Sequence, residues 1–314
     1  MTLDKEFFSQ YGDHFHNANP QDPSACIDLL KSSPTITYLH HEFAKIRLKS
    51  PAGPHTEFSV FGSPYSPRFG HWAFYYDAPQ ASSACPTLPS LWKDIPLNTD
   101  IVVTHTPPRA HCDETRTQVP GCEALRQALW RVRPRLAVCG HIHEARGAER
   151  VIWDLDCRHS PYAEKSTIKW VDSTEGTKKL SLVDLTGKKG PSLVNDGSHP
   201  TSSTLADKSE MGRLGSDDLE GSSDLPQLAT ASPSPSAAVD ARIPVSPPAV
   251  GLGGDPTSGR CDREALVGRM GRKETCVVNA ALMKSRFPHT GGKVLNKPII
   301  VDINLPVWVM EDEE

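Results

Sequence analysis

The stretch GCEALRQALWRVRPRLAVCGHIHEARG, residues 121–147, decides the fold of this chain. Its first half predicts a helix, because four apolar residues fall at i, i+3, i+4 and i+7 and the pattern stops before Pro134. Its second half begins with a short apolar run that is typical of a buried strand. The apolar face of the helix would consist of Leu125, Ala128, Leu129 and Val132.

Outside this stretch, further short runs rich in β-branched and apolar residues also predict strands. One run precedes the helix, so strand, helix and strand follow one another, as in an α/β fold with helices packed on a sheet. In such folds ligands collect beyond the carboxyl ends of the strands, where His105, His141 and His143 lie. The predicted strands are TITYL (35–39), AKIRL (44–48), EFSVFG (57–62), DIVVTH (100–105), RLAVCGH (135–141) and VIWDL (151–155).

The composition favours a soluble intracellular protein. The 314 residues carry a formal net charge of -4 with both signs interspersed, so nothing indicates binding to nucleic acid or to an anionic membrane. No apolar run is long enough to span a membrane and residues 1–20 lack the pattern of a signal peptide, so we expect a cytoplasmic location. The eight cysteines form no Cys-x-x-Cys pair, and we expect reduced thiols.

A polar segment divides the chain. Residues 186–272 mix Ser, Pro, Gly, Ala and Asp without apolar periodicity, and such a segment buries too little surface to offset the entropy of ordering. Two β-rich runs, ETCVVNAALM (274–283) and KPIIVDINLPVW (297–308), then look like closing strands of the same sheet. The predicted organisation is one domain formed by 1–185 and 273–308, a disordered insertion at 186–272 and an acidic tail at 309–314.

Three histidines at the predicted strand ends are candidate metal ligands. His105 precedes two prolines, which stiffen its loop because proline fixes φ and lacks an amide hydrogen. After Gly140, which permits a sharp turn, an extended segment would point His141 and His143 to the same side. Imidazole is a ligand for Zn, Fe and Ni and, together with carboxylates, for Mn. The alternative is that each histidine is a hydrogen-bonded structural residue.

Four segments together resemble the calcineurin-like metallophosphoesterase superfamily, in particular the small metallophosphoesterase-domain proteins of fungi and animals. The resemblance implies an α/β/β/α sandwich and a centre of two divalent metal ions, such as Mn, Fe or Zn, that hydrolyses small phosphate esters. By the order of the family motifs, His105 and His141 would hold one metal ion and His143 the other. The segments are FGSPYSPRFGHWAF (61–74), VVTHTPP (102–108), GC (121–122) and RPRLAVCGHIHEARG (133–147).

The resemblance also shows what is absent. The family motifs Asp-x-His, Gly-Asp and Gly-Asn-His-Asp, which supply the bridging carboxylate and the acid histidine, do not occur before His105. Residues 1–12 resemble the family segment that follows Gly-Asn-His-Asp, so the fold is expected to be incomplete at its N-terminus. Two metal ions about 3.5–4 Å apart need a bridging oxygen ligand, which imidazole does not supply. We therefore expect absent or weak activity, and the catalytic residues are unknown.

Weaker candidates have structural interpretations beside the functional ones. Asp13, His14 and His16 lie in a polar stretch without a preceding strand and are interpreted as a solvated loop. Asp113 and Glu144 could orient imidazoles, or could be solvated loop charges. The pair His40 and His41 is a further candidate. For the loop residues, packing is favoured over substrate contact; they are Tyr65, Arg68, Phe69 and Trp72. No chemistry is assigned to Asn279 and Asp302, and the thiols of Cys112, Cys122 and Cys139 lack the charged partner that a nucleophile needs.

Three hypotheses on function follow. The first is a metal-dependent phosphoesterase that acts on phosphodiesters or phosphomonoesters. The second is a non-catalytic remnant that serves as a scaffold and binds partners through the insertion at 186–272. The third is a mononuclear zinc site made by the three histidines. The sequence leaves the oligomeric state, the metal and the substrate open.

Overall fold

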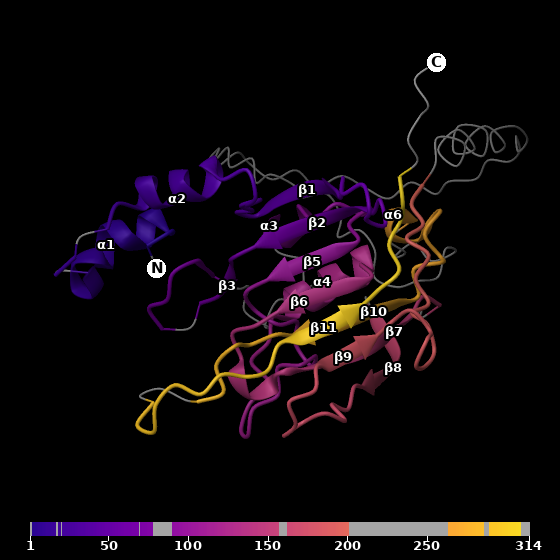
Figure 1. Ribbon diagram of the computed structural model, residues 1–314. Coiled ribbons are helices and arrows are strands. Elements are labelled where there is room, and N and C mark those ends of the chain that lie inside the picture. The colour runs from indigo at the N-terminus through magenta and orange to yellow at the C-terminus, as the bar shows by residue number, and fades with distance from the viewer. Residues whose placement is uncertain are drawn as a thin grey trace, which may run out of the picture.

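Figure 1 shows the fold in a computed structural model of the chain. Within the described residues, no helix is both long and apolar enough to cross a membrane. The described part is built around one large sheet. The structure describes residues 2–16, 18–19, 21–68, 70–77, 90–156, 162–200, 263–285 and 289–308.

A seven-stranded sheet forms the centre of the molecule, in the order β1-β2-β5-β6-β10-β7-β8. The inner strands β2, β5, β6 and β10 run parallel, whereas β1, β7 and β8 run antiparallel to their neighbours. The predicted α/β class is confirmed, because β5 and β6 flank helix α4 along the chain. The strands are β1 (Glu42–Arg47), β2 (Glu57–Ser63), β5 (Ile101–Thr104), β6 (Leu136–Cys139), β7 (Gly147–Asp154), β8 (Ala163–Lys169) and β10 (Glu274–Asn279).

Helix α4 (Glu123–Val132) packs on one face of the sheet, and the four apolar residues predicted for its face are all buried. Cys122 is its N-cap residue, and the Sγ of Cys122 accepts a hydrogen bond from the N–H of Leu125 at 3.2 Å. Arg133 is its C-cap residue and has a left-handed backbone with φ of 46°. Pro134 follows and prevents the helix from continuing. The same core receives side chains from α3 (Ser90–Lys93) and α6 (Arg263–Leu266).

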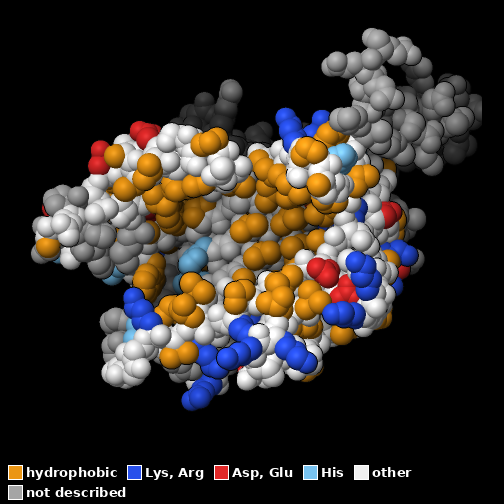
Figure 2. All heavy atoms as spheres, viewed as in Figure 1, with side chains coloured by type: hydrophobic (Ala, Val, Ile, Leu, Met, Phe, Trp, Pro, Cys, Tyr) orange, Lys and Arg blue, Asp and Glu red, His pale blue; other side chains and the backbone are white. Residues whose placement is uncertain are grey.

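A second, two-stranded sheet covers only part of the opposite face. Strands β9 (Ser181–Asp184) and β11 (Ile299–Asp302) pair in parallel and pack on β6 and β10 through a cluster that includes Leu136 and Val278. In the described part of the chain, no helix or strand lies over the same face of β1, β2 and β5 (Figure 1). Val103 on β5 is 40% exposed, and hydrophobic side chains spread over this open face (Figure 2).

Several predicted elements were wrong. Residues 35–39 contain no strand. Leu39 instead packs directly over Gly62 of β2, where a Cβ added to Gly62 would lie 2.7 Å from the Cβ of Leu39. The last β-rich run does not close the large sheet, since β11 pairs with β9 instead. The polar stretch around Asp13 is part of a helix, although Asp13 itself is exposed. Elements absent from the prediction are α1 (Lys5–His16), α2 (Pro23–Ser32), α3, α6, β3 (Ser66–Pro67), β4 (Tyr75–Tyr76), β8 and β9.

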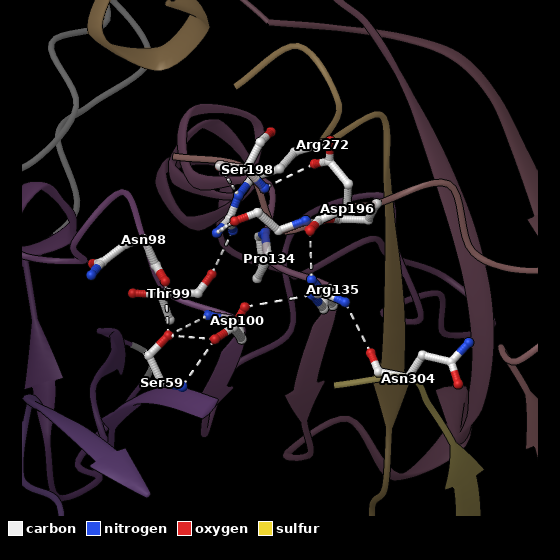
Figure 3. Close-up of polar contacts among 12 residues, drawn as sticks. Ser59, Asn98, Thr99, Asp100, Pro134, Arg135, Asp196, Ser198, Arg272 and Asn304 are labelled. Carbon is white, nitrogen blue, oxygen red and sulfur yellow. Dashed lines mark hydrogen bonds and ion pairs between the residues drawn. The ribbon is translucent and has the colours of Figure 1, made fainter. Parts of the chain in front are cut away.

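The boundaries predicted for the disordered insertion differ from the structure at both ends. Residues 186–200 and 263–272 are described, and Arg272 is fully buried. Its guanidinium donates to the carbonyl oxygens of Ser198 at 2.7 Å and Gly197 at 2.9 Å, which ties the two ends together (Figure 3). The composition of the segment could not show that its two ends are ordered, because the acceptors of these hydrogen bonds are backbone atoms. The remaining predicted insertion, 201–262, and the predicted tail, 309–314, lie outside the described residues.

Candidate functional site

Two loops that carry candidate histidines meet at the carboxyl edge of the large sheet. His105 follows β5 and His141 follows β6, and because these strands are parallel neighbours, both loops leave the sheet at the same edge. The ring centroids of His105 and His141 are 4.6 Å apart, with the ring planes inclined by 57°. The N–H of Gly140 donates to the carbonyl oxygen of His105 at 3.2 Å, which joins the two loops.

The loop after β6 is folded more tightly than the sequence predicted. His141 has a left-handed backbone with φ of 65°, and the N–H of Ile142 donates to the carbonyl oxygen of Gly140 at 2.7 Å. His143 then begins the short 3-10 helix η1 (His143–Ala145). The prediction of an extended segment through His141 and His143 was therefore wrong. A turn, and not strand alternation, sets the directions of the two rings.

Two of the histidine rings are neutral at physiological pH. Loss of hydration, together with the neighbouring rings of His105 and His143, lowers the pKa of His141 to about 4. Loss of hydration also lowers the pKa of His105, with a smaller contribution from His143. A neutral imidazole keeps a lone pair on one nitrogen, which is the form that binds a metal ion. The protonation state of these rings therefore suits ligation.

A buried carboxylate closes the loop that follows His105. Asp113 accepts hydrogen bonds from the N–H groups of Ala110 at 3.1 Å and Gly121 at 2.7 Å. Burial is the main cause of its raised pKa. These contacts connect the loop to itself, in place of the imidazole contact considered from the sequence. Glu144, the other residue considered for orienting an imidazole, is exposed in η1.

A buried histidine that sequence reasoning missed holds the same loop against the sheet. His111 is 1% exposed, with Nδ1 3.1 Å from Oε1 of Glu149 on β7 and Nε2 2.9 Å from Oε1 of Glu164 on β8. Burial by itself lowers the pKa of His111, but the hydrogen bonds to the two carboxylates outweigh burial and raise it to about 9. Glu164 also accepts from Nε of Arg126 at 2.8 Å. A charged cluster thus fixes the loop.

The histidine pair near the start of β1 has structural partners. Nδ1 of His41 lies 3.0 Å from Oγ of Ser63, and Nε2 lies 3.0 Å from the carbonyl oxygen of Leu91. The ring of His40 stacks on Tyr65, with centroids 5.8 Å apart. These contacts support the structural interpretation of both histidines and the packing role favoured for Tyr65.

The other loop candidates are also accounted for by packing and burial. Arg68 donates to Oδ1 of Asp77 at 2.5 Å and lies 3.7 Å from the ring centroid of Tyr75, whereas Trp72 is 53% exposed and Phe69 lies outside the described residues. Asp302 ends β11, away from the large sheet. Burial raises the pKa of each candidate thiol, the opposite of what a nucleophile needs. The thiols are Cys112, Cys122 and Cys139.

Relatives with known names match parts of the chain. The probable rhamnogalacturonate lyase C of Emericella nidulans is 42% identical over 123 residues, which are 38% of this chain and 10% of that protein. Metallophosphoesterase domain-containing protein 1 of Homo sapiens is 41% identical over 93 residues, 29% of this chain and 27% of that protein. A UPF0046 protein of Caenorhabditis elegans is 38% identical over 91 residues, 28% of this chain and 22% of that protein. No family profile matches the chain.

The matched part of this chain is similar to proteins of the calcineurin-like metallophosphoesterase superfamily. The resemblance predicted from the motifs around His105 and His141 is thereby confirmed. The matches span between 10% and 27% of the length of these relatives.

A cavity of about 470 Å³ lies at the same edge of this metallophosphoesterase-related sheet. It is lined by aromatic and charged side chains of both signs, among them Tyr38, Tyr65 and Phe74. The carbonyl oxygen of Ser63, two residues before the lining residue Tyr65, accepts from the N–H of His105 at 3.2 Å. The segment that lines the cavity at Tyr65 is thus joined to the His105 loop through Ser63.

The described residues do not by themselves fit the two-metal centre of the superfamily. Among them, no group of three or more His, Cys, Asp or Glu side chains is arranged to hold a metal ion. A pair of metal ions also needs a bridging oxygen ligand, and the candidate donors on the two loops are imidazoles. Without a bridging oxygen ligand, three imidazoles could serve at most a single ion.

Proposed function

We propose that this chain is part of a metal-dependent phosphoesterase and that its histidine loops bind one divalent metal ion. The observation that carries the proposal is the 4.6 Å separation of the His105 and His141 rings at the carboxyl edge of the sheet. A relative named as a metallophosphoesterase domain-containing protein supports the same reaction class. The residues that would hold the ion are His105, His141 and His143. Bound there, a divalent ion would act as a Lewis acid on phosphate oxygens.

The chain's own residues leave the site accessible and its loops fixed. His105 and His143 are exposed, so a phosphate ester can approach them from solvent. The lowered pKa of His141 keeps its ring unprotonated across the neutral range. Asp113 and the buried His111 hold the backbone that follows His105. The substrate proposed here is a small phosphate ester, in the first place a phosphodiester, with its organic group directed toward the cavity.

We expect hydrolysis by the chain as it stands to be weak or absent. The described residues supply imidazoles at the site but no bridging carboxylate. Loss of a general acid alone typically lowers a rate by about 10² to 10⁴. We further propose that β9 and β11 begin the second sheet of an α/β/β/α sandwich, a proposal supported by the open apolar face of β1, β2 and β5.

The test measures metal content and hydrolysis with the purified chain. Titration with Zn²⁺ or Mn²⁺ alone, followed by calorimetry, should show one bound ion, and His141→Ala should weaken its binding at least about tenfold. His14→Ala, an exposed histidine on α1, is the matched control and should leave affinity unchanged. Hydrolysis of bis-p-nitrophenyl phosphate with Mn²⁺ should be slow.

Each alternative result has a clear meaning. Absence of metal binding by the wild-type chain would contradict the proposed site and would favour the scaffold hypothesis. Fast turnover that disappears in His141→Ala would contradict the claim that the site is incomplete.

A further inference from the structure

The carboxyl end of β10 carries a fully buried asparagine that contacts both histidine loops. Nδ2 of Asn279 donates to the carbonyl oxygen of Cys112 at 2.9 Å and to that of Ile142, also at 2.9 Å. Its Oδ1 accepts from the N–H of Ala281 at 2.9 Å, so both ends of the amide are bonded. Asn279 is 0% exposed, and the amide is therefore held in one orientation.

The two acceptors of this amide belong to the two loops of the proposed site. Cys112 lies in the loop that follows His105, and Ile142 lies between His141 and His143. Strand β10 is the parallel neighbour of β6, so its end lies beside the loop that β6 feeds. The side-chain amide of Asn279 therefore sets the distance between the two loop backbones. The hydrogen bond from the N–H of Gly140 to the carbonyl oxygen of His105 also joins these loops.

We propose that Asn279 is a positioning residue for the histidine site and holds the His105 loop and the His141 loop at the separation that lets their rings bind one ion. The inference rests on the proposed function for its metal-binding part. Its structural part, the coupling of the two loops, stands on the two hydrogen bonds from Nδ2 alone. Outer residues that fix metal-ligand geometry typically change metal affinity by about 10- to 100-fold when mutated.

The chain contains a matched control for this residue. Asn195 is also buried, and its Nδ2 donates to the carbonyl oxygens of Arg133 at 3.0 Å and Glu274 at 2.7 Å. Its Oδ1 accepts from the N–H of Gly197 at 3.0 Å, two residues along, as Oδ1 of Asn279 does from Ala281. Because Glu274 begins β10 and Asn279 ends it, the two amides make the same bonds at opposite ends of one strand.

The experiment compares Asn279→Asp with Asn195→Asp in the full chain. Each change keeps the size of the side chain but removes the two N–H donors, so both variants should lose comparable stability. Only Asn279→Asp should lower the affinity for Zn²⁺ alone, by about 10- to 100-fold in calorimetry. Only Asn279→Asp should also speed hydrogen exchange of the Gly140 amide, by about tenfold, in the metal-free chain, because that amide donates between the two loops.

The two readouts separate this inference from the proposed function. If the wild-type chain binds no ion but Asn279→Asp still speeds exchange at Gly140, the loop coupling holds and the proposed function fails. If the wild-type chain binds Zn²⁺ and Asn279→Asp changes neither affinity nor exchange, the inference is overturned. A second variant, Asn279→Ser, keeps one donor and should fall between. Global unfolding of both Asn279 variants where Asn195→Asp stays folded would also overturn it, because a positioning residue acts locally.

Discussion

The two ends of the large sheet are held by opposite means. At the amino end, arginine side chains are buried and their guanidinium groups donate mainly to backbone carbonyl oxygens (Figure 3). At the carboxyl end, His105 and His143 are exposed, and the contact between His105 and His141 is one of ring against ring. The arginines are Arg133 at 0%, Arg135 at 9%, Arg269 at 0% and Arg272 at 0% exposure.

This difference separates what stabilises the fold from what is available for chemistry. At the amino end Arg272 joins segments that are far apart in the chain, since its acceptors lie at Thr99, Arg133, Gly197 and Ser198. A guanidinium that is buried against backbone carbonyl oxygens is closed off from a ligand in solvent. His105 and His143 at the other end are exposed to solvent, and loops of this kind on a rigid sheet are where binding residues concentrate.

The largest effect should come from removing the amino-end contacts. Arg272→Ala removes the donor of one buried and two part-buried carbonyl oxygens, and each such loss costs about 1–3 kcal/mol, so the free energy of unfolding should fall by about 3 kcal/mol. Chemical denaturation checks this. Arg68→Ala, which removes an exposed pair with Asp77, is the control and should cause little change. Equal effects of the two variants would contradict the assignment of stability to the buried arginines.

The second effect concerns pH and the carboxyl-end loop. The folded-state pKa of His111 is raised from 6.5 to about 9, so its contribution to stability is fully present below pH 6.5 and is lost as the pH rises through 9. The wild-type chain should lose on the order of 3 kcal/mol between pH 6 and pH 10 from this group. Denaturation across that range checks it, and His111→Gln should flatten the curve. An unchanged curve in His111→Gln would show that other groups cause the dependence.

The same comparison explains how much the sequence could predict. The unit of β5, α4 and β6 was predictable because its apolar residues follow helical and strand spacing, and the histidines were found because they stand at strand ends. The amino-end contacts were not predictable, because the arginines donate to backbone carbonyl oxygens. Every residue has such an oxygen, so the sequence does not indicate which ones serve as acceptors. His111 was missed for a related reason, since its carboxylate partners lie 38 and 53 residues away in the chain.

The third effect tests backbone strain at the open end. His141 has φ of 65°, a conformation that costs a non-glycine residue about 1 kcal/mol or more. Both His141→Ala and His141→Gly remove the ring, but only glycine removes the strain. The glycine variant should therefore be more stable than the alanine variant by about 1 kcal/mol in thermal or chemical unfolding. Equal stability would indicate that the loop relaxes once the imidazole is gone.

The smallest effect concerns the neighbouring residue, for which sequence and structure disagree. The sequence suggested that Gly140 permits a sharp turn or a close backbone approach, yet the left-handed residue is His141, and a Cβ at Gly140 would meet no atom within 4 Å. Gly140→Ala should therefore keep the metal affinity of the wild-type chain and change stability by no more than about 0.4–1 kcal/mol, in the stabilising direction, because alanine restricts the unfolded chain. Chemical denaturation and Zn²⁺ calorimetry check both parts. A loss above about 1 kcal/mol would mean that the turn depends on glycine after all, and that strain at the open end is shared by two residues.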